Sequence, residues 1–499
     1  MALVVSPVSL WAQTPLSAID WLSESVQERN VLPLTESEIP PGTEPEVIVV
    51  TPLEDLRKDS VGLLPTALTG LPRDFWGDSD SAVITDLIGR QSTQGLPEIL
   101  SLLYTILLAE LDAPRSTAAG DGLLLGRTDK LLELGALDQA QSLLERAGPT
   151  ESEIFRRWFD VALLTGQEDR ACDALTAQPG FAPTLPARAF CLARGGDWNA
   201  AALTVATGET LGFISLAEAD LLSWFLDPEL FAGEPDLPPP ARLTPLSFVM
   251  REAIAQPRPP GVLPQAFLHA DLSRSAGWRS QMEAAERLLR TQAIEPARLF
   301  DLYTEKKAAA SGGLWDRVRA IHDFDVALLS GDTVALQTTL PAAFNAMAAV
   351  SLEVAFARHY GDRLVNIEFS GPAADTAFRV ALLSDGFEQH AKRFAVNREE
   401  DLFLQGLTGG RVDTVAPPGT LGIAIRDGFS QPLPEGPLLD LLRDNRLGEA
   451  ILRAMLLLTD AGFADPGDIQ VALATLRAVG LEEEARRAAI QLLVLERRG

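Results

Sequence analysis

Three turns of one pattern follow each other between residues 131 and 207, and they constrain the fold more than any other feature of the sequence. Each turn has a glycine, four further residues and an alanine, at residues 135–140, 166–171 and 195–200. An apolar run with helical spacing precedes and follows each turn, and the glycines are 31 and 29 residues apart. Because periods of this size are typical of stacked helical hairpins, the sequence predicts an all-α fold.

The residues of these turns suit a connection between two helices. Glycine tolerates the positive φ at which helices commonly end, and alanine at the end of the turn lets the second helix approach the first closely. An aspartate in each turn is placed to cap the free N–H groups of the second helix or to meet its positive dipole end. These aspartates are Asp138, Asp169 and Asp197.

The glycine placed five residues before a small alanine resembles the turn of the tetratricopeptide (TPR) repeat. The resemblance implies a right-handed α-solenoid of helical hairpins, with a groove that holds a peptide or helix of a partner. The units are shorter than the family's usual length of about 34 residues. A looser α-solenoid and a set of unrelated helical hairpins are therefore both open alternatives.

The second half of the chain repeats the theme less regularly. Residues 324–331 nearly copy residues 159–166, and residues 378–385 form a third version. Near the C-terminus, Asn445 with Ala450 and Gly480 with Ala485 restore the five-residue offset. Ten prolines between residues 228 and 264 separate the two halves. We therefore predict a helical lobe at 78–227, a Pro-rich hinge at 228–264, and a second helical lobe at 265–499 with a loop insertion at 406–436.

The first residues predict export. Residues 1–12 are apolar and end in a small residue, which resembles a remnant of a secretory signal without its basic front end. We expect a periplasmic protein, with a cytosolic one as the alternative. Residues 13–77 read as an extended Pro-rich tail. From its β-branched residues 47–50 to Trp76, this tail is expected to run along the first lobe.

Composition and motifs exclude several classes of function. The net charge of −27 argues against nucleic acid and anionic membrane surfaces as partners. There is no apolar run long enough to span a membrane. The sequence has no phosphate loop, dinucleotide fingerprint or nucleophile elbow. Its four histidines are far apart, so we expect no cofactor and no metal site.

One enzyme class pairs an α-superhelix with the periplasm, namely the lytic transglycosylases, which cleave murein. Their catalytic glutamate lies in a Glu-Ser pair that a Gly-Leu-Met-Gln-type segment follows. Here Glu24-Ser25 and Glu151-Ser152 are present, but no such segment follows either pair. The sequence thus favours a non-catalytic scaffold or adaptor that binds a protein, with the murein enzyme and a cytosolic interaction protein as alternatives.

Two groups of residues are candidates for special roles. Cys172 and Cys191 fall on adjacent predicted helices, so an exported chain can join them if their Cα atoms lie within about 7 Å; the alternative is two buried thiols. The candidate groove residues, chosen from position alone, are Arg156, Arg157, Asp160 and Arg188 in the first lobe, with Arg319 and Asp323 in the second. The expected partner is a protein of an envelope assembly such as a flagellar motor, pilus or secretion machine, by analogy with other periplasmic repeat scaffolds.

Overall fold

The computed structural model describes residues 58–115, 122–258, 261–273, 275–413, 415–459 and 465–495. Within them every regular element is a helix, apart from one isolated parallel bridge between Leu64 and Ala109. The predicted all-α class is therefore confirmed for this part of the chain. None of its helices combines the length and the apolar character needed to cross a bilayer. The expected signal at residues 1–12 and the β-branched residues 47–50 lie outside it.

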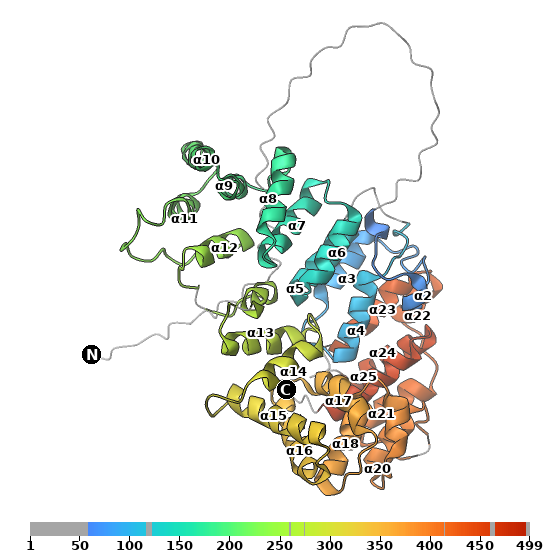
Figure 1. Cartoon of the computed structure of the whole chain (residues 1–499). Coiled ribbons are helices and arrows are strands. Elements are labelled where there is room, and N and C mark those ends of the chain that lie inside the picture. Colours follow the sequence, from blue (N-terminus) through green and yellow to red (C-terminus); the bar gives the residue numbers. More distant parts are fainter. Residues whose placement is uncertain are drawn as a thin grey trace, which may run out of the picture.

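Three helical hairpins follow each other in the first lobe, in the region of the repeated turns (Figure 1). Consecutive helices pack against one another along this series. Their bounds are α5 (Gly122–Leu134), α6 (Leu137–Ala147), α7 (Ser152–Leu164), α8 (Glu168–Ala177), α9 (Leu185–Arg194) and α10 (Trp198–Thr210). A short 3₁₀ segment, η3 (Pro179–Phe181), lies between α8 and α9.

The predicted glycines end the first helices of two hairpins. Gly135 follows α5 with φ of 82°, and Gly166 follows α7 with φ of 73°. The backbone N–H after each glycine donates to the carbonyl five residues earlier, at 2.8 Å in both turns. This bond closes the last turn of the helix, and the positive φ of glycine makes it attainable without a Cβ clash.

The third turn is shifted by one residue from the prediction. Its left-handed residue is Gly196, with φ of 84°, whereas Gly195 stays in the right-handed region. Accordingly Ala201, not Ala200, is the fully buried alanine of the following helix. The offset of five residues is thus kept, since both positions move together. Asp197 caps α10 by accepting a hydrogen bond from the N–H of Ala200 at 3.0 Å.

The chain folds back after the third hairpin. Helix α11 (Leu216–Leu226) packs on α9 and α10, and α12 (Pro245–Ala253) packs on α11 and on α7. Thr244 starts α12 through a reciprocal capping pair with Ser247. The predicted hinge at 228–264 therefore contains a helix that covers the first lobe. The 3₁₀ helix η4 (Gln265–Leu272) then packs against α5, α7 and α13.

The residues assigned to the second lobe form a longer series of packed helices. Their bounds are α13 (Trp278–Arg290), α14 (Pro296–Glu305), α15 (Leu314–Ser330), α16 (Thr333–Ala348), α17 (Glu353–Leu364), α18 (Gly371–Leu383), α19 (Phe387–His390), η5 (Ala391–Arg393), α20 (Glu399–Thr408), α21 (Gly419–Ser430), α22 (Pro437–Arg443), α23 (Leu447–Thr459), α24 (Pro466–Ala478) and α25 (Glu482–Val494).

The predicted loop insertion at 406–436 is wrong, because α21 occupies much of it. Ile425 and Phe429, four residues apart, are buried and give the helix an apolar face. Gly428 permits the close packing of α21 on α24: a Cβ there would lie 3.1 Å from the carbonyl oxygen of Gln470. Gly428, which counted toward a loop in the sequence, instead serves helix–helix contact.

The first helices of the chain lie with the last ones (Figure 1). Helix α3 (Ser81–Arg90) packs on α23, and α4 (Pro97–Leu108) packs on α23 and α25. The side chain of Gln91 donates to the carbonyl of Leu452 at 3.0 Å, and the N–H of Glu98 donates to the side chain of Gln491 at 2.9 Å. The predicted lobes at 78–227 and 265–499 therefore divide helices that pack against one another.

The described end of the predicted tail, from Lys58 onward, is built into the body. It includes η2 (Lys58–Ser60) and α2 (Thr66–Thr69). The buried guanidinium of Arg127 holds it by donating to the carbonyls of Val61 and Ala109, at 2.8 and 3.0 Å. Further on, Trp76 is buried against Gly448, where a Cβ would lie 2.5 Å from the indole ring. The tail thus contacts the first lobe and then reaches α23.

Candidate interaction site

The candidate groove residues of the first lobe lie mostly inside it. Arg156 and Arg157, both on α7, are buried. Arg157 is bound by the carboxylate of Asp129 at 2.6 and 2.8 Å, so its charge has a partner within the chain. Asp160 on the same helix is partly buried, and burial raises its pKa to about 7, against the effect of the two arginines. These side chains are not a free binding surface, which corrects the prediction for them: helices on several sides cover α7.

The other candidates are exposed but not gathered. Arg188 lies on α9, whereas Arg319 and Asp323 lie on α15 in the second lobe. Arg319 pairs with Asp316 at 3.3 Å on its own helix. Asp323 lies 3.8 Å from the imidazole of His322. Position alone therefore does not bring these residues together in one site.

A disulfide joins Cys172 on α8 to Cys191 on α9, with the Cα atoms 4.9 Å apart. The two helices are the neighbours that the repeat spacing predicts. Both residues are buried. The bond ties the second hairpin to the third one covalently, and so fixes the helices that lead to the end of the first lobe.

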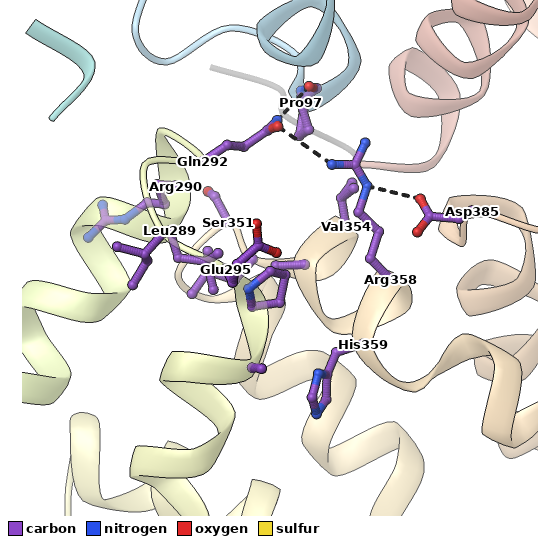
Figure 2. A pocket seen from close by; sticks show the side chains of 15 residues that line it. Pro97, Leu289, Arg290, Gln292, Glu295, Ser351, Val354, Arg358, His359 and Asp385 are labelled. Atoms are coloured by element: carbon purple, nitrogen blue, oxygen red, sulfur yellow. Dashed lines mark hydrogen bonds and ion pairs between the residues drawn. The ribbon is translucent and has the colours of Figure 1, made fainter. Parts of the chain in front are cut away.

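A cavity of about 420 Å³ lies where α4, the α13–α14 turn and α17 meet (Figure 2). Gln292 lines it and has a left-handed backbone (φ 58°), and its side chain donates to the carbonyl of Pro97 at 2.6 Å. The guanidinium of Arg358 lies 3.4 Å from Asp385 and 3.6 Å from Glu98. The polar groups of the cavity thus bind one another and join three distant parts of the chain.

The electrostatics of this cavity follow from its burial. Glu98 lies behind the lining residue Arg358, and its burial raises the pKa of its carboxyl to about 7, an effect that the charge of Arg358 partly offsets. His359, which lines the cavity, stacks on Phe300 with ring centroids 4.8 Å apart, and burial lowers the pKa of this histidine. We interpret the cavity as a polar joint between α4 and the second lobe.

One of the two Glu-Ser pairs that were compared with the murein enzymes, Glu151-Ser152, lies among the described residues. Glu151, at the start of α7, is exposed and forms an ion pair with Lys58. The other pair, Glu24-Ser25, lies outside the described residues. Among the residues that are described, no cluster of three or more His, Cys, Asp or Glu side chains is arranged to hold a metal ion.

Helix α10 lies at the outer end of the first lobe (Figure 1). Five large apolar side chains are exposed on this helix, on its turn to α11 and at the first residue of α11. We call these residues the tip surface. Leu203, at its middle, is 68% exposed. The members are Trp198, Leu203, Leu211, Phe213 and Leu216.

Sequence reasoning missed the tip surface, although a signal was present. No charged residue occurs on α10 between Trp198 and Gly208, in a chain where 22% of residues are charged. An uncharged helix reads as buried. Only the packing shows that α10 has helices on one side, α9 and α11, and solvent on the other.

Comparison with known protein families, curated proteins and solved structures finds no significant match. The tip surface, the disulfide and the polar joint therefore have to be interpreted from their own chemistry.

Proposed function

We propose that this chain is a non-catalytic scaffold or adaptor that binds another protein through the tip surface. One observation carries the proposal: five large apolar side chains are exposed on α10, on the turn that follows it and at the first residue of α11. Exposed apolar groups of this kind mark interaction sites when they gather on a monomer. Scattered single leucines would carry no such meaning.

The proposed architecture agrees with this role. We interpret the hairpins α5–α10 as units of a right-handed, TPR-like α-solenoid, in which each unit buries its apolar face against the next. The end of such an array needs a polar outer face if it stays in solvent. From Trp198 to Gly208 helix α10 has instead no charged side chain, and Leu203 is exposed, which suits a contact with another protein.

The proposed location is the periplasm, as a component of an envelope assembly. The apolar residues 1–12 and the pair of cysteines support it, because disulfides persist in oxidising compartments. Cell fractionation tests the location. Recovery of the protein in the cytosol, with Cys172 and Cys191 as free thiols after denaturation, would contradict it.

Site-specific photo-crosslinking in the native cells tests the binding role. A photoreactive amino acid at Leu203 or Phe213 is expected to give an adduct with one partner protein. The control is the same amino acid at Thr338, which is exposed on α16. Absence of any adduct from the tip positions, or an equal yield of the same adduct from the control position, would end the proposal.

A further inference from the structure

The tip surface lies in a strongly acidic part of the chain. Between Arg194 and Arg242 there is no lysine, arginine or histidine, and there are eight acidic residues. All eight are exposed. They are Asp197, Glu209, Glu218, Asp220, Asp227, Glu229, Glu234 and Asp236. Three of them lie on the helices of the tip surface itself: Glu209 on α10, and Glu218 and Asp220 on α11, which packs against α10. We call these three residues the acidic rim, and an apolar surface beside them favours a cationic partner.

The shape of α10 favours another helix as the occupant. Its inner residues Ala201, Val205 and Gly208 are buried. Its exposed residues between Asn199 and Thr207 are small or uncharged around Leu203. Small side chains on a helix face allow a second helix to approach closely, while one leucine inserts between the side chains of the incoming helix.

The turn after α10 is held in one conformation. The N–H groups of Phe213 and Ile214 both donate to the carbonyl of Gly208, at 2.8 and 3.1 Å. A Cβ on Gly208 would lie 2.6 Å from the side chain of Ile214, so only glycine permits this contact. Leu211 and Phe213 are therefore exposed from a fixed turn and need little ordering when they bind.

We propose that the tip surface binds a cationic amphipathic helix of the partner, which packs along α10 as the next helix of the array. The apolar side of this helix covers Leu203 and the turn residues, and its lysine or arginine side chains face the acidic rim. This inference rests on the proposed function and names the chemistry of its partner.

Charge argues against three other occupants of this surface. A second copy would bring the same acidic rim against itself, and like charges across an interface are strongly unfavourable. The chain's own residues 13–57 contain nine acidic and two basic residues, so they would be repelled in the same way. An anionic lipid surface is disfavoured for the same reason.

Binding of two matched peptides to the full-length protein tests the proposal. Both peptides have leucine at heptad positions a and d over about three heptads; one has lysine at the remaining positions and the other has glutamate. In fluorescence anisotropy, the lysine peptide is expected to bind at least tenfold more tightly than the glutamate peptide. Its affinity is expected to fall as salt screens the rim.

Leu203→Glu separates this site from general attraction between a basic peptide and an acidic protein. The substitution adds negative charge, so non-specific attraction would increase. We expect at least a tenfold loss of affinity for the lysine peptide instead, because the apolar contact is lost. Val334→Glu on α16, at another exposed apolar position, is the matched control and should bind like the wild type. Circular dichroism of both variants verifies that they fold.

A second pair of variants tests the rim. Replacing Glu209 by Gln and Asp220 by Asn is expected to lower the affinity for the lysine peptide severalfold. The control replaces Glu399 and Glu400, which are exposed at the start of α20, by Gln and should have no effect.

The outcomes separate this inference from the proposed function. Equal binding of both peptides, or unchanged binding by Leu203→Glu, would overturn the inference; a crosslink from Leu203 to a partner would still support the function. A dimer in sedimentation that Leu203→Glu dissociates would overturn it in favour of a second copy. If neither a peptide nor a partner binds at the tip, both proposals fail.

Discussion

Two helices carry almost the same eight residues and bury them differently. Residues 159–166 end α7, and residues 324–331 end α15. Val161 is fully buried, whereas its counterpart Val326 is 51% exposed. Leu164 is 4% exposed, whereas its counterpart Leu329 is 71% exposed.

The difference comes from what the rest of the chain places against each helix. Helix α15 packs between α14 and α16, while α7 has α6 and α8 beside it and α12 across it. Leu164 and Phe248 of α12 line one cavity of about 600 Å³. The repeated eight residues therefore specify a helix end and its capping turn. Whether Val161 and Leu164 are buried depends on α12, a helix of the Pro-rich segment.

Weakening the packing of α12 on α7 should have the largest effect on stability. Phe248, which is buried on α12 and meets Phe267 edge to face at 5.2 Å, contributes a large part of that packing. Phe248→Ala is expected to destabilise the first lobe by about 3–5 kcal/mol. Hydrogen exchange of α7 should rise toward that of α15. The control Phe213→Ala, at an exposed position, should cost about 0.5 kcal/mol or less. Unchanged exchange in α7 would show that α12 is not the cause of the difference.

The paired leucines test the comparison position by position. Leu164→Ala is expected to cost about 2–5 kcal/mol, because it leaves a cavity in the core. Leu329→Ala at the matched position should stay within about 0.5 kcal/mol. Urea unfolding of both variants measures the two costs. Similar costs would contradict the assigned difference in burial.

The disulfide is expected to strengthen the first lobe selectively. The bond between Cys172 and Cys191 closes a short loop, and the chain-entropy relation gives about 3 kcal/mol for a loop of this size. Replacing both cysteines by alanine should therefore lower the unfolding transition of the first lobe and leave that of the second lobe in place. A uniform shift of both transitions would mean that the lobes unfold as one unit. Two free thiols in the denatured, unreduced wild type would remove the basis of the prediction.

The smallest effect concerns the aspartate of the repeated segment. Burial raises the pKa of Asp160 to about 7 from the usual 3.8, so the unfolded chain releases its proton at lower pH than the folded protein does. The carboxyl's contribution to stability is then full below about pH 4 and is lost as the pH rises to about 7. Asp160→Asn should stabilise the protein relative to wild type by on the order of 1 kcal/mol at pH 8 and by less at pH 4.

The counterpart Asp325 on α15 is the control for this prediction. It lies 3.8 Å from Arg363, so Asp325→Asn removes an ion pair and should slightly lower the melting temperature. Melting curves at several pH values measure both variants. An advantage of Asp160→Asn that does not grow with pH would contradict the assigned burial of this carboxyl.

Local features of the fold were predictable from the sequence. The turns at Gly135 and Gly166 have the expected backbone, and Asn445 takes the left-handed conformation, with φ of 55°, where it replaces glycine in the pattern. These features depend on residues close together in the sequence. The one-residue shift of the third turn to Gly196 was not predictable, because Gly195 and Gly196 are adjacent and satisfy the same pattern. Only the hydrogen bonds distinguish them.

Features that depend on distant residues were not predictable. No periodic signal links Glu98 to Gln491, and Gly428 looks like a loop residue until α24 packs on it. The groove residues failed for the same reason: Arg157 was expected at a surface, but Asp129 of the preceding hairpin binds it inside. The tip surface could be predicted only by knowing that no described helix packs on the outer side of α10.

The packing of the first helices on the last ones also determines when the N-terminal part can finish folding during synthesis. The partners of α3 and α4 lie in α23 and α25, and the hydrogen bonds from Gln91 and Glu98 span 361 and 393 residues. During synthesis the N-terminal helices emerge long before these partners exist. Contacts so distant along the chain form slowly, because a large loop must close first. We therefore expect Phe75 and Trp76 to stay uncovered until translation is nearly complete, so that a late truncation leaves the beginning of the protein unfinished.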